Sequence, residues 1–306
     1  MTYFIFNLTN IILPIFIQIF LGYIIKKFIK FNNAALATIQ FYIIIPALLF
    51  VSMYNADIDE NIAIKISLHS VVIFMLLYLL GILISKIFKY NKSTTSAFTN
   101  SICLYNSGNY CLPLVQLLYN NPLATSIQII IMTVQTIITS TVGIYIISSG
   151  KKNIKEGILE ILKVPMIYCI IIGLFLRYMN IQVWPPILTA ATSIGNSLVP
   201  IALISLGAQL AETKYSFKIP KVYFSSLVRL LISPLIAYVL VLALGLKGIT
   251  AEIAIISSAA PTAVNSVLLA IQYDSEPDFA SQAVFFSTIV SSITVSLIIF
   301  LVAGKL

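Results

Sequence analysis

Long apolar runs separated by short polar segments dominate the chain. A helix needs about 20 apolar residues to cross a hydrocarbon core of ~30 Å, and ten stretches of this sequence reach about that length. Their approximate bounds are 7–28, 35–54, 62–86, 93–119, 124–149, 157–179, 186–211, 220–244, 250–273 and 279–303. The pattern therefore predicts an all-α membrane protein with ten transmembrane helices. Because the first run has full spanning length and no basic residue precedes it, we expect it to remain as a span rather than to be cleaved as a signal peptide.

The composition supports the membrane class. Charged residues make up 9% of the 306 residues and apolar residues 59%, whereas roughly a quarter of the residues in a soluble domain are charged. Disordered, collagenous, disulfide-scaffold and ordinary soluble-enzyme classes are thereby excluded. The three cysteines, Cys103, Cys111 and Cys169, lie in apolar runs without metal-ligand spacing, so we interpret them as packing residues. We predict no metal site and no cofactor.

The basic residues predict the orientation of the chain in the membrane. Thirteen of the 18 lie in the loops that follow runs 1, 3, 5 and 7, and four lie on the opposite side. These thirteen are Lys26, Lys27, Lys30, Lys86, Lys89, Lys92, Lys151, Lys152, Lys155, Lys163, Lys214, Lys218 and Lys221. By the positive-inside rule these loops face the cytoplasm, so both termini are expected outside the plasma membrane, or the inner membrane of a Gram-negative cell. The net charge of +8 thus reflects topology, and no nucleic-acid partner is predicted.

The most basic loop separates two halves, residues 1–149 and 150–306, with five runs each. An odd number of spans per half makes the second half enter the membrane from the opposite side, which predicts inverted repeats. The second run of each half carries a proline near its middle, Pro46 and Pro200.

The fourth run of each half is interrupted by residues that disfavour a continuous helix. The interrupted sequences are NSGNYCLP from Asn106 to Pro113 and SSAAPTAVNS from Ser257 to Ser266. Proline removes a backbone donor and clashes with the preceding turn, and irregular backbone at membrane depth persists only in protein or beside a water-filled cavity. Paired breaks at corresponding positions therefore predict a transporter site near the midplane, and an ordinary proline kink is the alternative.

The interrupted segments resemble those of a known family. The pattern Asn-x-Gly-Asn-x-x-Leu-Pro in Asn106–Pro113 is similar to a signature of the auxin efflux carrier family, and Pro261–Tyr273 resembles the ninth span of that family. Pro200–Leu210 and Ala280–Thr288 fit the same pattern. The resemblance covers essentially the whole chain and is to short, bacterial-type members without a long cytoplasmic loop. Cys111 departs from the pattern, because glycine is more usual there.

The resemblance implies the fold of bile-acid sodium symporters. Spans 1, 2, 6 and 7 would form a scaffold, spans 3–5 and 8–10 would form a mobile transport domain, and discontinuous spans 4 and 9 would cross at the midplane. It also implies transport of small organic anions such as malonate, malate or auxin. A homodimer through the scaffold spans is left open.

The two breaks provide the candidate substrate site. Unpaired N–H groups at the start of each second half-helix are equivalent to roughly half a positive charge and favour an anion. The candidate substrate-binding residues there are Asn106, Ser107, Gly108, Asn109, Pro113, Pro261, Thr262 and Asn265. The asparagine amides would orient a carboxylate; hydrogen bonding between packed helices is their alternative role.

Three further polar residues within spans are candidates. Arg229 lies in run 8, about nine residues or ~13 Å from the cytoplasmic end. Three alternative roles are open for it: to attract the substrate, to bind carbonyls exposed at a break, or to extend to the membrane interface. His69, the single histidine, is a candidate for proton coupling, with a structural role as the alternative. Gln135 shares one helix face with Thr139 and Gly143, which indicates either the transport path or close helix packing.

The acidic residues bear on coupling and on enzyme classes. No Asp or Glu occupies a break within a span, whereas bile-acid symporters place a carboxylate there to bind sodium. A sodium site of the bile-acid type is therefore disfavoured. Carbonyls and amides also bind sodium in transporters, so the sequence leaves coupling to protons or to sodium open. The alternatives to an organic-anion transporter are a sodium-coupled symporter of the bile-acid type and a non-transporting receptor. A channel lacks a filter motif, and an intramembrane enzyme lacks a nucleophile–base pair.

Overall fold

The computed structural model describes residues 8–29, 31–56, 58–147, 165–213 and 219–305. Over these ranges the chain is helical, with one isolated antiparallel bridge between Tyr105 and Thr262. Seven helical stretches in this part of the chain are long and apolar enough to cross a membrane. They are Thr9–Phe28, Asn33–Asn55, Glu60–Ile87, Pro122–Ile147, Pro185–Glu212, Pro220–Leu244 and Pro277–Val302. The predicted all-α membrane class is confirmed.

These seven stretches coincide with predicted runs 1, 2, 3, 5, 7, 8 and 10. Of the other three, run 6 is described only from Pro165 onward, where a helix covers Pro165–Tyr178, and runs 4 and 9 are divided into shorter helices. The number of ten spans stays a prediction. The predicted cytoplasmic loop with Lys151, Lys152, Lys155 and Lys163, and the basic residues Lys30, Lys214 and Lys218, lie outside the described residues.

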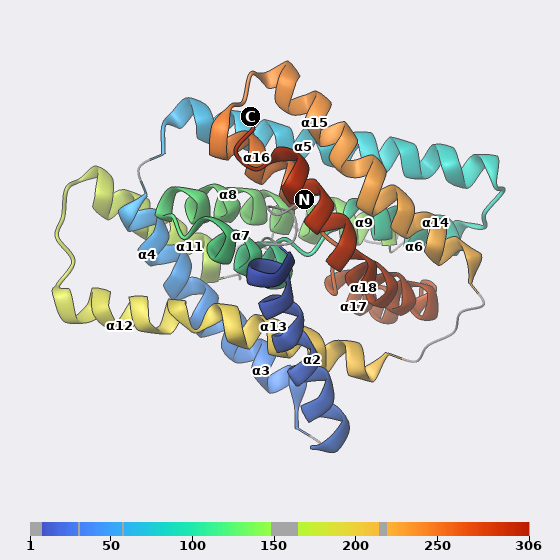
Figure 1. Cartoon of the computed structure of the whole chain (residues 1–306), viewed down its shortest axis with the longest axis horizontal. Helices are drawn as coiled ribbons and strands as arrows, with labels where there is room; N and C mark the ends of the chain where they lie inside the picture. Colours follow the sequence, from blue (N-terminus) through green and yellow to red (C-terminus); the bar gives the residue numbers. More distant parts are fainter. Residues whose placement is uncertain (1–7, 30, 57, 148–164, 214–218, 306) are drawn as a thin grey trace.

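Sixteen described α-helices follow one another along the chain (Figure 1). They are α2 (Leu13–Phe28), α3 (Asn33–Ile39), α4 (Ile45–Asn55), α5 (Glu60–Ile87), α6 (Lys92–Cys103), α7 (Leu112–Tyr119), α8 (Pro122–Ile138), α9 (Ile144–Ile147), α11 (Pro165–Tyr178), α12 (Pro185–Asn196), α13 (Leu198–Glu212), α14 (Pro220–Leu227), α15 (Ser233–Leu244), α16 (Gly248–Ser258), α17 (Asn265–Gln272) and α18 (Pro277–Val302). Single π-helical turns occur at Leu8–Ile12, Gln40–Ile44, Ser107–Cys111, Thr139–Gly143 and Val228–Ile232. Such turns occur frequently at functional sites.

Local sequence explains where several helices begin. Asn91 accepts a hydrogen bond from the Thr94 N–H at 2.7 Å and caps α6, and Asn121 accepts one from the Leu123 N–H at 2.8 Å and caps α8. A side-chain acceptor at this position satisfies one of the N–H groups that a helix start leaves unpaired. Proline in the first turn of α8, α12 and α18 removes a donor that would be unpaired there in any case.

One group of helices packs around α2 and α4. Helix α13 lies along α2, and α11 and α12 pack against α4 (Figure 1). Glycines allow the close approach: a Cβ atom on Gly207 would lie 1.8 Å from the Ile19 oxygen, and one on Gly22 would lie 2.0 Å from the Ile204 oxygen. Because lipid tails are as apolar as the side chains, close backbone packing is the main attraction between such helices.

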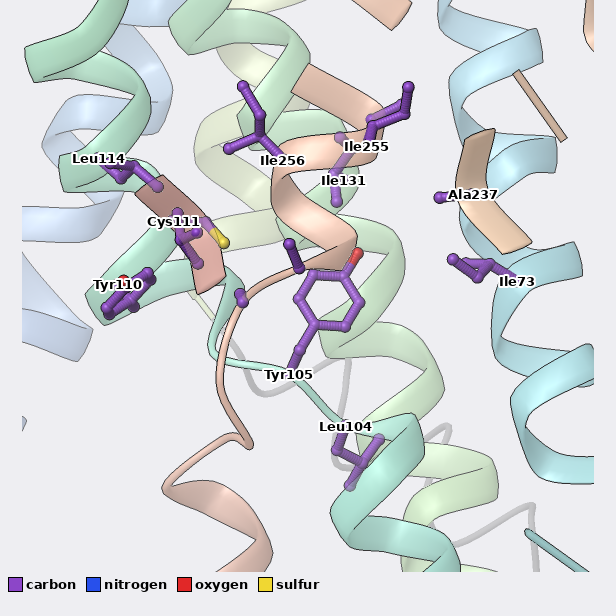
Figure 2. Packing of buried hydrophobic residues seen from close by; sticks show 14 of the residues in the cluster. Ile73, Leu104, Tyr105, Tyr110, Cys111, Leu114, Ile131, Ala237, Ile255 and Ile256 are labelled. Carbon is purple, nitrogen blue, oxygen red and sulfur yellow. The ribbon is translucent and has the colours of Figure 1, made fainter. Parts of the chain in front are cut away.

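A second group contains α5 to α9 and α14 to α18. Helix α5 packs against α6, α8 and α15, and α18 packs against α6, α14, α16 and α17. Figure 2 shows the interior of this group, where Ile131 of α8 and Ile255 of α16 lie near the ring of Tyr105, and Ile73 of α5 faces Ala237 of α15. The two groups meet where α13 contacts α7 and where α4 contacts α8.

Both predicted breaks coincide with interrupted backbone in this second group. Helix α6 ends at Cys103 and α7 begins at Leu112, and α16 ends at Ser258 and α17 begins at Asn265. The two connecting segments pair in antiparallel fashion (Figure 2). The Asn106 N–H donates to the Pro261 oxygen at 2.9 Å, and the Ala263 N–H donates to the Leu104 oxygen at 2.9 Å. Segments about 150 residues apart in sequence are thereby fixed side by side.

Candidate functional site

A cavity of about 260 Å³ lies beside the paired segments. Its walls come from both groups of helices, namely from Gln40 and Gln209 in the first group and from Tyr105–Asn109, Gln135 and Ala263–Asn265 in the second. The described residues that line it include no charged side chain. Three of the five π-helical turns contribute residues to its lining. Side-chain amides and hydroxyl groups supply its polar side-chain groups.

The structure brings six predicted substrate residues together at this cavity. They are Asn106, Ser107, Gly108, Asn109, Gln135 and Asn265. The remaining predicted residues lie elsewhere and do not line it. They are Pro113, Pro261, Thr262, Arg229 and His69.

Asn106 connects the two breaks and presents an unpaired donor. Its Oδ1 accepts the Asn109 N–H at 3.1 Å, which orients the amide because a backbone N–H only donates. Its Nδ2 is buried and has no hydrogen-bond partner among the described residues. Buried polar groups in proteins are nearly always paired. Asn106 lines the cavity but its Nδ2 atom is closed to solvent, so a ligand could pair with it only after a movement of this side chain.

Three glutamines from three different spans face the same cavity. The Gln40 Nε2 donates to the Asn109 Oδ1 at 3.4 Å, and the Gln135 Nε2 donates to the Cys103 oxygen at 3.4 Å. Within the described chain, the Oε1 atoms of Gln135 and Gln209 are buried without a partner. Sequence reasoning missed Gln40 and Gln209. One signal could have found them: each is a polar residue within the second span of its half, near the end that the lysine-rich loops place in the cytoplasm.

Gln128 holds the two breaks together beneath the cavity. Its Nε2 donates to the Ser107 oxygen at 2.9 Å, and its Oε1 accepts the Ser257 hydroxyl at 2.5 Å. The side chain is fully buried. Both ends of the amide are satisfied, so Gln128 has a structural role in this arrangement.

Arg229 binds the ends of two helices rather than the cavity. The side chain is fully buried, its Nη1 donates to the Ile102 oxygen at 2.7 Å, and its Nη2 donates to the Ser258 oxygen and the Ser233 hydroxyl. The guanidinium lies 4.9 Å from the centre of the Tyr105 ring, which lines the cavity. Of the roles considered for Arg229, the structure shows the bond to carbonyls exposed at a break.

Arg229 lies at the ends of two helices, whereas the starts of two others lie next to the cavity. The C-terminal ends of α6 and α16 each carry about half a negative charge, and the Arg229 guanidinium offsets them through Ile102 and Ser258. The π-helical turn before α7 begins at Ser107, and α17 begins at Asn265. Both residues line the cavity. The dipoles of these helix starts favour an anion, although the Asn106 side chain already accepts the Asn109 N–H and the Ala263 and Val264 oxygens accept the Ser266 and Val267 N–H groups.

The prolines and Thr262 shape the breaks. Pro113 lies in the first turn of α7, and the Pro261 carbonyl takes part in the pairing of the two segments. The Thr262 hydroxyl donates to the Ser101 oxygen at 2.8 Å, and the Thr262 N–H donates to the Ser287 hydroxyl at 3.1 Å. These contacts fix the backbone rather than a ligand.

His69 and the acidic residues lie away from the cavity. His69 is buried between α5 and α15 and is hydrogen-bonded to the backbone of Ala237. The Glu252 carboxylate accepts the Tyr119 hydroxyl and the Gly304 N–H, both at 2.8 Å. Among the described residues no group of three or more His, Cys, Asp or Glu is placed to hold a metal ion.

Several helices that are long and apolar enough to cross a membrane, around a cavity lined by amides, are typical of a multi-pass membrane transport protein. The chain belongs to the family described as membrane transport protein, whose model matches residues 7–158 and 151–299. This match confirms the resemblance to the auxin efflux carrier family.

The curated relatives carry transporter names. An uncharacterized transporter of Methanothermobacter thermautotrophicus is 24% identical over 94% of this chain and 96% of its own length. An uncharacterized transporter of Methanocaldococcus jannaschii is 23% identical over the same shares of the two chains. A Rhizobium meliloti protein named "Putative malonate transporter" is 22% identical over 97% of this chain and 96% of its own length.

Proposed function

We propose that this membrane transport protein is a secondary transporter of small organic anions, such as malonate, malate or auxin-like carboxylates, and that it works by alternating access at the plasma membrane. The observation that carries the proposal is the cavity at the starts of two interrupted helices, which is lined by Asn106, Asn109 and Asn265 and, among the described residues, by no charged side chain. The name of the Rhizobium meliloti relative supports the same substrate class.

The proposed architecture consists of ten spans in two inverted repeats, residues 1–149 and 150–306. Spans 1, 2, 6 and 7 would be the scaffold, and spans 3–5 and 8–10 the transport domain. The separate packing of α2, α4, α11, α12 and α13 on one side, and of α5 to α9 and α14 to α18 on the other, supports this division. The antiparallel pairing of the two breaks supports a crossing of spans 4 and 9.

A substrate in the cavity would touch both units. Gln40 and Gln209 belong to the proposed scaffold, and Asn106, Gln135 and Asn265 belong to the proposed transport domain. In the predicted topology Gln40 and Gln209 lie near the cytoplasmic ends of their spans. This position supports an inward-facing arrangement, from which a displacement of the transport domain relative to the scaffold would expose the site on the other side.

Coupling is the least constrained part of the proposal. A sodium site of the bile-acid type would require a carboxylate at a break, and the described residues that line the cavity include none. Sodium would then depend on amides and carbonyls. Proton coupling through His69 would have to act through the packing of α5 on α15, because His69 does not line the cavity.

Counterflow in liposomes tests the proposal. The purified protein is reconstituted with unlabelled malate or malonate inside, and uptake of the labelled acid is followed with and without sodium. We expect uptake above that of empty liposomes and a rise in the thermal midpoint with ligand, since a ligand of the native state stabilises it by mass action. Stabilisation without any flux would favour the receptor alternative. Neither effect across a panel of mono- and dicarboxylates would refute an organic-anion transporter.

A further inference from the structure

A second cavity, of about 860 Å³, lies between the two groups of helices. Its walls come mainly from α4 and α11 of the first group and from α5 and α8 of the second. Ile64, Leu68 and Leu174 line it and are exposed, so this crevice is open to the surroundings of the protein, which at these spans are the bilayer. We propose that the crevice binds the acyl chain of an outer-leaflet phospholipid, and that Arg177 and Glu60 bind its zwitterionic head group.

The crevice differs from an ordinary lipid-facing surface because four helices enclose it. Helix α4 packs against α11 and α8, and α8 packs against α5 (Figure 1), so a chain in the crevice contacts a row of packed helices rather than one helix face. The volume is within the range of ~300–1,000 Å³ that is typical of ligand sites. Among the described residues, none lines both this crevice and the cavity at the breaks. The lipid site is therefore separate from the proposed substrate site.

The depth of the crevice matches one leaflet of the bilayer. Along α5 its lining extends from Glu60 to Val71, a stretch over which the helix rises about 16 Å. Half of a hydrocarbon core of ~30 Å is about 15 Å. In the predicted topology the end at Glu60 faces outward, so an acyl chain whose head group lies at that end would reach to about the midplane.

The charged residues of the crevice lie at its outer end. Glu60 is in the first turn of α5 and Arg177 is in the last turn of α11, and no other charged side chain of the described residues lines the crevice. A guanidinium binds phosphate well. The carboxylate of Glu60 attracts an ammonium group and repels a head group with net negative charge. Both signs of charge at one end therefore favour phosphatidylethanolamine over phosphatidylglycerol.

The walls beyond this end suit a hydrocarbon chain. They include the side chains of Val71, Ile129, Ile130, Val134 and Ile170. Two hydroxyl groups also lie there, but each donates within its own helix at 2.8 Å, Ser67 to the Ala63 oxygen and Thr133 to the Ile129 oxygen. Because these donors are already used, burial of apolar surface is the main interaction that the deeper crevice offers.

Quenching of tryptophan fluorescence by brominated lipid tests the site in the full-length protein. The single tryptophan, Trp184, is replaced by Phe. Leu68→Trp then places a reporter in the crevice, and Leu79→Trp places one on the same helix outside the crevice lining. Leu68 and Leu79 are equally far from the two ends of α5, so the reporters have matched depths in opposite leaflets.

Vesicles that mix phosphatidylethanolamine and phosphatidylglycerol, with either lipid brominated, give the relative binding constant at each reporter. At Leu68→Trp we expect phosphatidylethanolamine to be preferred about threefold to fivefold, the size of one charge interaction at a membrane surface. At Leu79→Trp the ratio should be close to one. Glu60→Gln should lower the crevice ratio to one or below, because an anionic head group is no longer repelled. Asp278→Asn, the same change of charge in the first turn of α18 outside the crevice, should leave it unchanged.

The outcomes decide the inference without any measurement of transport. A ratio close to one at both reporters, or a preference for phosphatidylglycerol in the crevice, would overturn it. A crevice preference that Glu60→Gln leaves unchanged would also overturn it. Asp59, which caps α5 by accepting the Asn61 N–H at 2.8 Å, is retained in Glu60→Gln, so this variant should fold. If Leu68→Trp does not fold, Leu174→Trp reports from the opposite wall of the crevice. Failure of the lipid site would leave the proposed anion transport intact.

Discussion

The exchange of Asn106 for aspartate tests the anion site with little change of shape. One amide NH₂ becomes a carboxylate oxygen, and the side-chain volume is nearly unchanged. The remaining oxygen can still accept the Asn109 N–H, which lies at 3.1 Å in the native protein, and the backbone N–H can still donate to the Pro261 oxygen. The contacts that hold the break are thus retained in Asn106→Asp.

The expected effect on anion binding is large. The new negative charge replaces the Nδ2 atom of a residue that lines the cavity in which we propose that the substrate carboxylate binds. Two unit charges ~4 Å apart repel by about 4 kcal/mol at an effective dielectric constant of 20. Since every 1.4 kcal/mol changes a dissociation constant tenfold, this repulsion would raise the dissociation constant of a carboxylate by up to about 1,000-fold. We expect at least a 100-fold loss of carboxylate affinity, because the aspartate itself would occupy the positive potential of the two helix starts.

Uptake of labelled malate into liposomes, normalised to folded protein, measures this effect, and the thermal midpoint of the ligand-free protein measures folding. Asn121→Asp is the matched control. Asn121 also accepts a hydrogen bond from a backbone N–H, that of Leu123 at 2.8 Å. It lies at the start of α8, outside the cavity lining. Aspartate caps helices as well as asparagine does, so the control should fold. Transport by folded Asn106→Asp within threefold of the control would refute an anion site at this break.

Three further predictions concern the rest of the molecule. Replacement of Arg229 by Met leaves the two helix-end carbonyls without their donor. We expect the free energy of unfolding in detergent to fall by about 2–6 kcal/mol and to recover partly in Arg229→Lys. An unchanged thermal midpoint of Arg229→Met would contradict the role of this residue. Gly207→Ala places a methyl group 1.8 Å from a backbone oxygen of α2, so we expect a loss of at least about 1–3 kcal/mol, and normal thermal stability would show that the two helices can separate freely. A cysteine at position 153, in place of Asn153, should react in intact cells only with a membrane-permeant thiol reagent; labelling by an impermeant reagent would reverse the predicted orientation.

Two features of the fold were predictable because they depend on local sequence alone. The length of an apolar run decides whether a helix can cross a bilayer, and seven of the predicted runs appear as helices of sufficient length in the described part of the chain. Glycine, proline and asparagine disfavour a continuous helix wherever they cluster. The interruptions before Leu112 and before Asn265 therefore fall where the sequence places them.

The relation between the breaks was decided only by the tertiary structure. Nothing in the local sequence of Tyr105 or Thr262 specifies that these residues pair. Arg229 illustrates the same limit: sequence alone left it as a substrate ligand, a partner of exposed carbonyls or an interfacial residue. Its carbonyl partners, Ile102 and Ser258, lie 127 and 29 residues away along the chain, so only the packed helices select among these roles.

The composition of the cavity follows the same division. The asparagines of the first break were recognisable because they stand beside the irregular backbone that they stabilise. Gln40 and Gln209 lie in otherwise regular apolar spans, and each becomes part of the cavity only when its helix packs against the breaks. Sequence by itself determined seven of the spans, the positions of the two breaks and the family. Tertiary packing determined which amides share one cavity and which remain unpaired, because hydrogen-bond satisfaction depends on neighbours in space rather than along the chain.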